Sequence, residues 1–219
     1  MKRFPILTLC FLLSATVAFA QEPAVSPKMQ AVYDACLNLR AAIKAGSTAA
    51  LRTANTALKA CDTSPFASLR AADTSAPTLD GHFIFDQVFV DSLIEGRDVY
   101  RFAQRYAESR SVRGSTSAGK IYTKNAAVKA RSSVKFTFRS RDHQELAVVT
   151  EPGATDRDAA ITLRVHDLTH DQWYNDTRDI KRGQPSRLLS FDLPSDPCKL
   201  ELEVINCGNK DISFVVISN

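Results

Sequence analysis

The densest group of residues able to do chemistry lies between His166 and Asp171, where the sequence reads HDLTHD. Imidazole and carboxylate groups serve as general acids, general bases and zinc ligands, and two histidines four residues apart can share a metal when the segment is helical. The apolar run at 161–165 predicts a strand directly before this segment, so we expect a polar loop in which His166 and His170 do not bind a metal. A small hydrolase that uses His166, Asp167 and His170, with or without a metal, is the enzymatic alternative.

The same polar segment carries the adjacent aromatic residues Trp173 and Tyr174. Aromatic side chains on a loop can stack on a sugar ring or a peptide, which makes these two residues candidates for ligand binding. The alternative, which we favour, is that Trp173 covers one end of the hydrophobic core.

Motifs of the common enzyme classes are absent from the sequence. It contains no glycine-rich phosphate loop, no HExxH and no GxSxG. The remaining histidines, His82 and His143, are isolated and are expected at the surface or in a turn. The sequence therefore favours a protein that is not an enzyme and uses no cofactor.

Charge is distributed unevenly along the chain. Residues 97–141 carry twelve Lys and Arg and a net charge of +10, whereas residues 142–219 carry a net charge of −6. A basic face of this kind could bind an anionic glycan, an anionic lipid headgroup or an acidic protein, and Arg101 and Arg105 are candidate ligand-binding residues within it. The alternative is that basic strands pair beside acidic strands and their fields cancel.

The first twenty residues have the layout of a secretory signal peptide. The chain begins Met-Lys-Arg, continues with an apolar run at residues 6–15 and reaches Ala-Phe-Ala before Gln21, which predicts cleavage after Ala20. No segment has the ~18 to 20 apolar residues of a membrane span, so we expect a periplasmic or secreted protein without one. The formal charge of +4 falls to +2 without these twenty residues, which gives no argument for nucleic acid as a partner.

In an exported protein the number of cysteines bears on whether disulfides form. Cleavage leaves Cys36, Cys61, Cys198 and Cys207, an even number for an oxidising compartment. Cys36 and Cys61 lie on the facing sides of a predicted helical hairpin and are expected to form a disulfide. Cys198 and Cys207 flank a predicted strand that spans roughly 30 Å when straight. Bonded cysteines have Cα atoms about 4.4–6.8 Å apart, so this second pair needs a bend and its pairing stays open.

Two helices are predicted within residues 27–62. Apolar residues recur there every three or four positions, as on the buried face of an amphipathic helix. Ser26 is the expected N-cap of the first helix, Gly46 its end, and Ser47 or Thr48 the cap of the second. These residues therefore predict a helical hairpin.

The middle of the chain is less regular. Residues 63–77 are rich in Ser, Thr, Pro and Ala and predict a linker or a loosely docked segment. After them we expect a short strand at 83–85 and a helix capped by Asp86. A further helix is expected at 99–109, for which alternating aromatic and basic residues leave a strand as the alternative.

From Gly119 the apolar pattern changes to a period of two residues. Strands are predicted at 120–124, 127–131, 134–139, 145–150, 160–165, 187–191, 199–205 and 212–217. Short strands separated by turn residues, with no helices between them, predict an antiparallel β-sandwich that is jelly-roll-like. The fold class is thus α+β, mainly β. The expected parts are a signal peptide at 1–20, a helical hairpin and linker at 21–76, and a β-sandwich domain at 77–219 whose residues 77–118 are a mixed lead-in.

The end of the chain resembles the bacterial pre-peptidase C-terminal domain. Leu200–Asn206 followed by Ser213–Asn219 looks like the end of that domain, and 134–138 and 163–167 lie where the family has strands, so the resemblance covers 119–219. It implies a β-sandwich of an exported protein that acts as an accessory or binding module without catalysis of its own. This chain differs from the family's pattern in carrying two extra cysteines.

These observations together predict an exported, non-enzymatic binding or envelope-accessory protein. The expected partners are an envelope glycan, an anionic lipid headgroup or another envelope protein, and the sequence does not choose among them.

Overall fold

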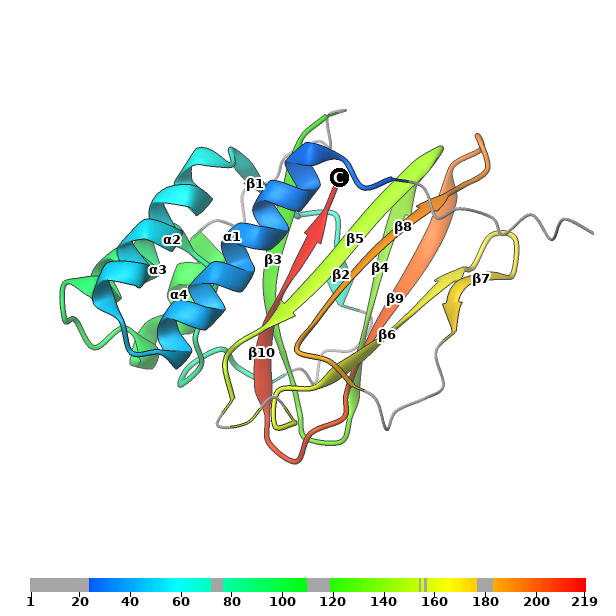
Figure 1. Cartoon of the computed structure of the whole chain (residues 1–219). Coiled ribbons are helices and arrows are strands. Elements are labelled where there is room, and N and C mark those ends of the chain that lie inside the picture. Colours follow the sequence, from blue (N-terminus) through cyan, green and yellow to red (C-terminus); the bar gives the residue numbers. More distant parts are fainter. Residues whose placement is uncertain (1–23, 72–76, 110–118, 154, 156, 177–182) are drawn as a thin grey trace, which may run out of the picture.

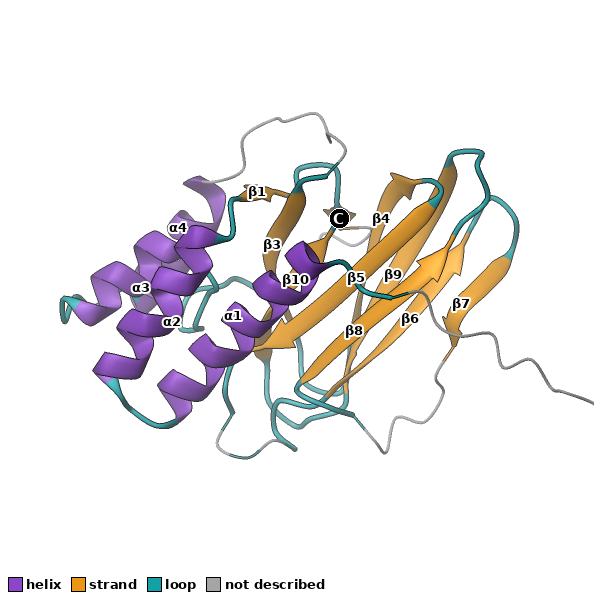
Figure 2. Ribbon diagram, turned by 45° about the horizontal axis from the view of Figure 1, so that its top comes forward, coloured by secondary structure: helices purple, strands orange, loops and turns teal. Residues whose placement is uncertain are grey.

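Three layers of secondary structure build the molecule (Figures 1 and 2). The structure is a computed structural model that describes residues 24–71, 77–109, 119–153, 155, 157–176 and 183–219. A layer of helices covers one face of a five-stranded sheet, and a second five-stranded sheet packs against the other face. The predicted α+β, mainly β fold is confirmed, whereas the predicted signal peptide lies outside the described residues.

The helix layer contains the predicted hairpin. Its elements are α1 (Pro27–Lys44), α2 (Thr48–Ala60), α3 (Gln87–Ile94), the 3-10 helix η1 (Tyr100–Phe102) and α4 (Ala103–Ser109). The side chains of Ser26, Ser47 and Asp86 cap α1, α2 and α3 as expected, each by accepting a hydrogen bond from a backbone N–H of the first turn. A helix at 99–109 is confirmed. No helix within the described residues is both long and apolar enough to cross a membrane.

Within the described residues, ten strands form the two sheets. They are β1 (Thr63–Pro65), β2 (Arg70–Ala71), β3 (Ile121–Val128), β4 (Ser133–Ser140), β5 (His143–Thr150), β6 (Ile161–Asp167), β7 (Gln172–Asp176), β8 (Ser186–Asp192), β9 (Cys198–Asn206) and β10 (Ile212–Ser218). The first sheet has the order β1-β3-β10-β5-β8, and the second has the order β2-β4-β9-β6-β7. From β3 onward, successive strands alternate between the two sheets as in a jelly roll, except that β6 and β7 lie in the same sheet. This arrangement confirms the predicted sandwich.

Several details of the predicted elements were wrong. The two strands predicted at 120–124 and 127–131 are replaced by one strand, β3, which ends at Val128, and residues 129–131 lie outside it. Residues 83–85 form no strand: the N–H of Phe83 donates to Glu151, and that of Phe85 donates to Asn125. The predicted linker contains β1 and β2, which lie at the edges of the two sheets and so tie them together.

Burial on two faces explains the composition of the central strand. Every residue of β10 is buried, with Val215 and Ile217 in the core beneath the helices and Phe214 and Val216 in the core between the sheets. Strands covered on both faces read as continuous apolar runs. In the second sheet β9 has one solvated face instead, and its residues alternate between buried and more exposed positions.

Candidate functional site

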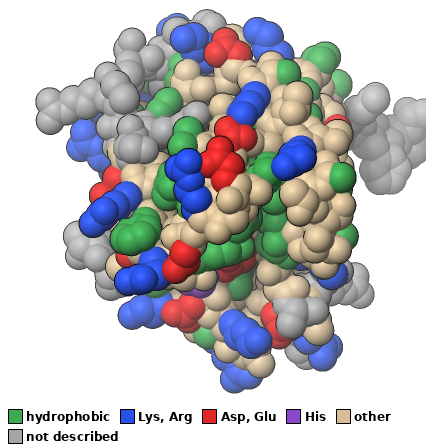
Figure 3. Space-filling model, turned by 90° about the vertical axis from the view of Figure 1, so that its left-hand side faces the viewer, with side chains coloured by type: hydrophobic (Ala, Val, Ile, Leu, Met, Phe, Trp, Pro, Cys, Tyr) green, Lys and Arg blue, Asp and Glu red, His purple; other side chains and the backbone are tan. Residues whose placement is uncertain are grey.

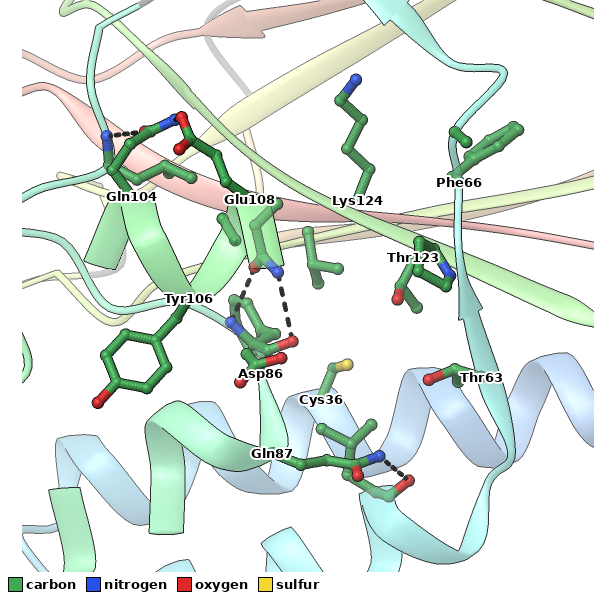
Figure 4. A pocket seen from close by; sticks show the side chains of 18 residues that line it. Cys36, Thr63, Phe66, Asp86, Gln87, Gln104, Tyr106, Glu108, Thr123 and Lys124 are labelled. Atoms are coloured by element: carbon green, nitrogen blue, oxygen red, sulfur yellow. Dashed lines mark hydrogen bonds between the residues drawn. The ribbon is translucent and has the colours of Figure 1, made fainter. Parts of the chain in front are cut away.

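A cavity of about 280 Å³ lies between the helix layer and the edge of the first sheet (Figure 4). Cys36 of α1 lines one side, Phe66 and Ala67 line another, and the end of α4 and β3 complete it. Its lining residues come from many separate segments of the chain, from α1 to β10. No single stretch of sequence therefore contains a motif for this site, and it could not be predicted from the sequence.

The strand pairing explains why a cavity forms at this place. β1 pairs with β3 only as far as Thr123, whose carbonyl accepts the N–H of Phe66 at 2.9 Å. The chain then leaves the first sheet to form β2 in the second. Beyond Thr123 no strand within the described residues pairs with this edge of β3, and the segment from α3 to α4 forms the opposite wall.

Most polar groups of the wall are engaged in holding it together. The amide of Asn125 exchanges two hydrogen bonds with the backbone of Phe85, at 2.8 and 3.4 Å. Gln104 accepts the N–H of Leu79 at 3.0 Å and donates to Glu108 at 2.6 Å (Figure 4). These contacts fix the shape of the cavity and leave much of its surface apolar.

Lys124 differs from these groups because its charge is not paired. Its Nζ donates to the carbonyl of Leu69 at 2.6 Å, and no carboxylate of the described chain forms an ion pair with it. The side chain is half-buried, and burial lowers its pKa. Figure 4 shows Lys124 leaving β3 on the side opposite to Thr123, away from Cys36. A cavity with apolar side chains in its wall and a cationic donor at one end can hold a ligand that has an apolar body and an anionic end.

Cys36 is not set up as a nucleophile. Its side chain is buried, and burial together with the neighbouring Cys61 raises the pKa of its thiol far above the ordinary value. The thiolate is the reactive form of cysteine, so this thiol is inert near neutral pH. Its role in the cavity is that of an apolar wall.

The predicted aromatic pair does not act as a unit. Trp173 and Tyr174 lie on β7, a strand where we expected a loop, and neighbouring residues of a strand point to opposite faces. Tyr174 stacks on Phe191 at 4.6 Å beside the core, whereas Trp173 is 40% exposed on the outer face and does not cover the core. His166 stacks on the Trp173 ring at 4.2 Å and Arg164 lies 4.4 Å from it, so two neighbouring side chains already cover part of the ring.

The two histidines of the polar cluster, His166 and His170, contact different carboxylates. His166 is on β6, and its Nε2 contacts Asp171 at 2.9 Å. His170 is in the following turn, and its Nδ1 contacts Asp167 at 2.7 Å. Because the segment is the end of β6 followed by a turn, rather than the loop we expected or a helix, the two imidazoles contact different carboxylates.

The basic stretch is divided among several parts of the surface. Arg101 and Arg105 lie on either side of Phe102 in sequence, with guanidinium carbons 5.7 and 5.1 Å from its ring centroid. On the face that carries the helices, Lys and Arg side chains are scattered with Asp and Glu between them (Figure 3). Lys135 of β4 forms an ion pair with Glu201 of β9 at 2.8 Å, as the alternative of basic strands beside acidic strands predicted.

Three residues of the basic stretch do meet at one end of the sandwich. Lys120, Arg139 and Arg141 line a hollow of about 740 Å³ together with Lys28. Asp142 and the buried Glu145 line it as well, so its charge is mixed. Binding of an anionic partner by the basic stretch stays a prediction.

All four described cysteines are free thiols. Cys198 begins the nine-residue strand β9 and Cys207 follows its end, so the two are too far apart for a disulfide. Cys36 and Cys61 are close enough to interact electrostatically, but the predicted disulfide between them is not formed in this structure. It stays a prediction for the oxidised protein.

Comparison with known proteins gives remote structural likenesses only. No protein-family model and no curated protein matches the chain. PliG from Aeromonas hydrophila, a periplasmic inhibitor of g-type lysozyme, is similar with a TM-score of 0.33 and 10% identity, over 48% of this chain and 91% of that one. PliG from Salmonella Typhimurium has a TM-score of 0.30 and 15% identity, over 49% of this chain and 95% of that one. The C-terminal CBM6 of LamC from Zobellia galactanivorans has a TM-score of 0.26 and 9% identity, over 43% of this chain and 79% of that one. Likenesses this remote assign no function, and the resemblance to the pre-peptidase C-terminal domain stays a prediction.

Proposed function

We propose that this protein is an exported binding protein, without catalysis of its own, that takes a small organic anion into the cavity between its helices and its first sheet. The observation that carries the proposal is the ammonium group of Lys124, which forms no ion pair within the described residues, at one end of a cavity lined by both apolar and polar groups. A cation that is partly removed from water gains free energy when an anion pairs with it. The cavity supplies the other half of the recognition by burying the apolar body of the ligand.

The size and the lining of the cavity support binding rather than turnover. A volume of about 280 Å³ suits a molecule somewhat smaller than a typical drug. The polar groups around it are hydrogen-bonded to the backbone or to each other, and the thiol of Cys36 is held in its protonated form by burial. Groups fixed in this way shape a ligand site, whereas a catalyst needs an activated nucleophile or a free base.

A cavity-filling substitution tests the proposal. The probe is anilinonaphthalene sulfonate, which has an aromatic body, one anionic group and a fluorescence that rises when it leaves water. Ala107 of α4 lines the cavity, so Ala107→Leu occupies part of the space that the probe needs. We expect saturable binding to the wild-type protein and at least about tenfold weaker binding to this variant, a loss of ~1.4 kcal/mol.

Ala57→Leu is the matched control, because Ala57 is exposed on α2 and does not line the cavity. We expect it to bind the probe as the wild-type protein does. Equal binding by all three proteins would place the probe elsewhere and contradict the proposal.

A further inference from the structure

The turn between β6 and β7 brings three different kinds of metal ligand together. Oδ2 of Asp167 lies 2.7 Å from Nδ1 of His170, and Sγ of Cys198 lies 3.6 Å from the same nitrogen. One ligand atom from each residue lies within 4.8 Å of the other two. Asp167 and Cys198 are fully buried, whereas the side chain of His170 is 37% exposed.

These three residues do not have the geometry of a catalytic triad. In a triad the nucleophile and the carboxylate contact different ring nitrogens of the histidine, so that a proton can pass through the ring system. Here Cys198 and Asp167 both approach Nδ1. Burial, with the neighbouring Asp167, also raises the pKa of the Cys198 thiol to about 11, so that it is a poor nucleophile at neutral pH.

Convergence on one point is instead what a cation requires. Zinc binds sulfur at about 2.3 Å and nitrogen at about 2.0–2.1 Å, and a tetrahedral angle then places those two atoms about 3.5 Å apart. The observed separation of Sγ and Nδ1 is 3.6 Å. The carboxylate oxygen and Nδ1 now share a proton at 2.7 Å and need to move apart by about half an ångström.

The backbone holds the three residues in place without a metal. Oδ1 of Asp167 accepts the N–H of Thr169 at 2.8 Å, which leaves Oδ2 to face His170. The N–H of Leu168 donates to the carbonyl of Lys199 at 2.8 Å, and the N–H of Lys199 donates to Oγ1 of Thr169 at 2.8 Å. The turn is thus fastened to the start of β9, directly beside Cys198.

We propose that Asp167, His170 and Cys198 form a zinc site with three protein ligands and a fourth position open to solvent beside His170. Zinc replaces the thiol proton of Cys198, which goes to solvent, and binds the lone pair of Nδ1 of His170, whose neutral ring then carries its one proton on Nε2 instead of Nδ1. The carboxylate and the thiolate then balance the two positive charges of the ion. Three protein ligands with one open position is the arrangement by which zinc binds a water molecule or a further ligand. This site is separate from the cavity and does not rest on the function proposed for it.

Zinc titration of the reduced, metal-free full-length chain tests the site. The substitutions are Cys198→Ser, which preserves size, and His170→Gln, at a half-exposed position where folding is tolerant. Cys207→Ser is the control, since Cys207 is also a partly buried thiol but lies at the far end of β9. Competition with a chromophoric chelator gives the affinity, and elemental analysis gives the stoichiometry.

We expect one zinc ion per chain in the wild-type protein and in Cys207→Ser, and about 100-fold or greater loss of affinity in both ligand variants. Cobalt(II) in place of zinc should give a thiolate-to-metal charge-transfer band that disappears in Cys198→Ser. Absence of stoichiometric zinc in the wild-type protein would overturn the proposal. So would undiminished affinity in His170→Gln, or a cobalt complex without the thiolate band.

Discussion

His82 shows how a single side chain can fasten an irregular segment to a sheet. Its Nδ1 lies 2.6 Å from a carboxylate oxygen of Glu151, and the same carboxylate accepts the N–H groups of Phe83 and Ser213. The hydrogen bond to Glu151 is the main cause of a raised pKa for His82, and the charges of Glu151 and Asp211 add to it against the opposing effect of burial. We had expected an isolated surface residue, because its partner is 69 residues away in the sequence.

The raised pKa of His82 predicts a pH-dependent stability. A histidine whose pKa is higher in the folded than in the unfolded protein stabilises the fold fully below its unfolded value of 6.5, and this contribution is lost as the pH rises through the folded value. His82→Gln should therefore lower the free energy of unfolding by about 1–2 kcal/mol at mildly acidic pH and by less at alkaline pH. Urea unfolding of both proteins across this range measures the difference. A loss that is the same at every pH would show that the charge of His82 is not involved.

The start of α1 is joined to the first sheet by one buried carboxylate. Glu145 of β5 is 1% exposed, and its two oxygens accept the backbone N–H and the hydroxyl of Ser26. Oγ of Ser26 in turn accepts the N–H of Met29 and caps the helix. The helix cap was predictable from Ser26 and the pattern that follows it. The acid that orients this cap was not, since Glu145 lies 119 residues away from Ser26 in the sequence, on a strand that is buried on both faces.

Glu145→Gln should weaken the contact between the helix layer and the sheet. The amide presents an N–H₂ group where an acceptor is needed, which leaves a buried donor without a partner and lowers the free energy of unfolding by about 1–3 kcal/mol. Glu95→Gln, at an exposed position after α3, should change it by less than ~0.5 kcal/mol. Chemical unfolding of the two variants gives the comparison, and equal effects would contradict the anchoring role of Glu145.

The elements that sequence reasoning found and missed differ in length and in burial. Strands such as β9 alternate between buried and more exposed residues over nine positions, and this period is visible in the sequence. β1 and β2 have three and two residues, too few for any period, and the first ends on a proline. β7 lies at the edge of its sheet and is rich in polar residues, so that its backbone pairing with β6 left no apolar signal.

At the scale of the whole molecule, the sandwich was predictable and the position of the helices was not. Helical periodicity at 27–62 indicated a hairpin with an apolar face but not the surface that this face covers. A signal was available in the apolar run 214–217 of β10, which indicates a strand covered on both faces. Predicting the cavity requires knowing where the helices pack, because it forms only where the helix layer, the β1–β2 segment and the edge of β3 meet.

The central claim is that Lys124 binds the anionic end of a ligand in this cavity. The most direct test is isothermal titration with an aromatic carboxylic acid that competes with the sulfonate probe, and with the neutral methyl ester of the same acid. The wild-type protein should bind the acid at least about tenfold more tightly than the ester, and Lys124→Gln should abolish this preference. Lys129→Gln, at an exposed position at the end of β3, should retain it. An equal preference for the acid in the wild-type protein and in Lys124→Gln would contradict the account.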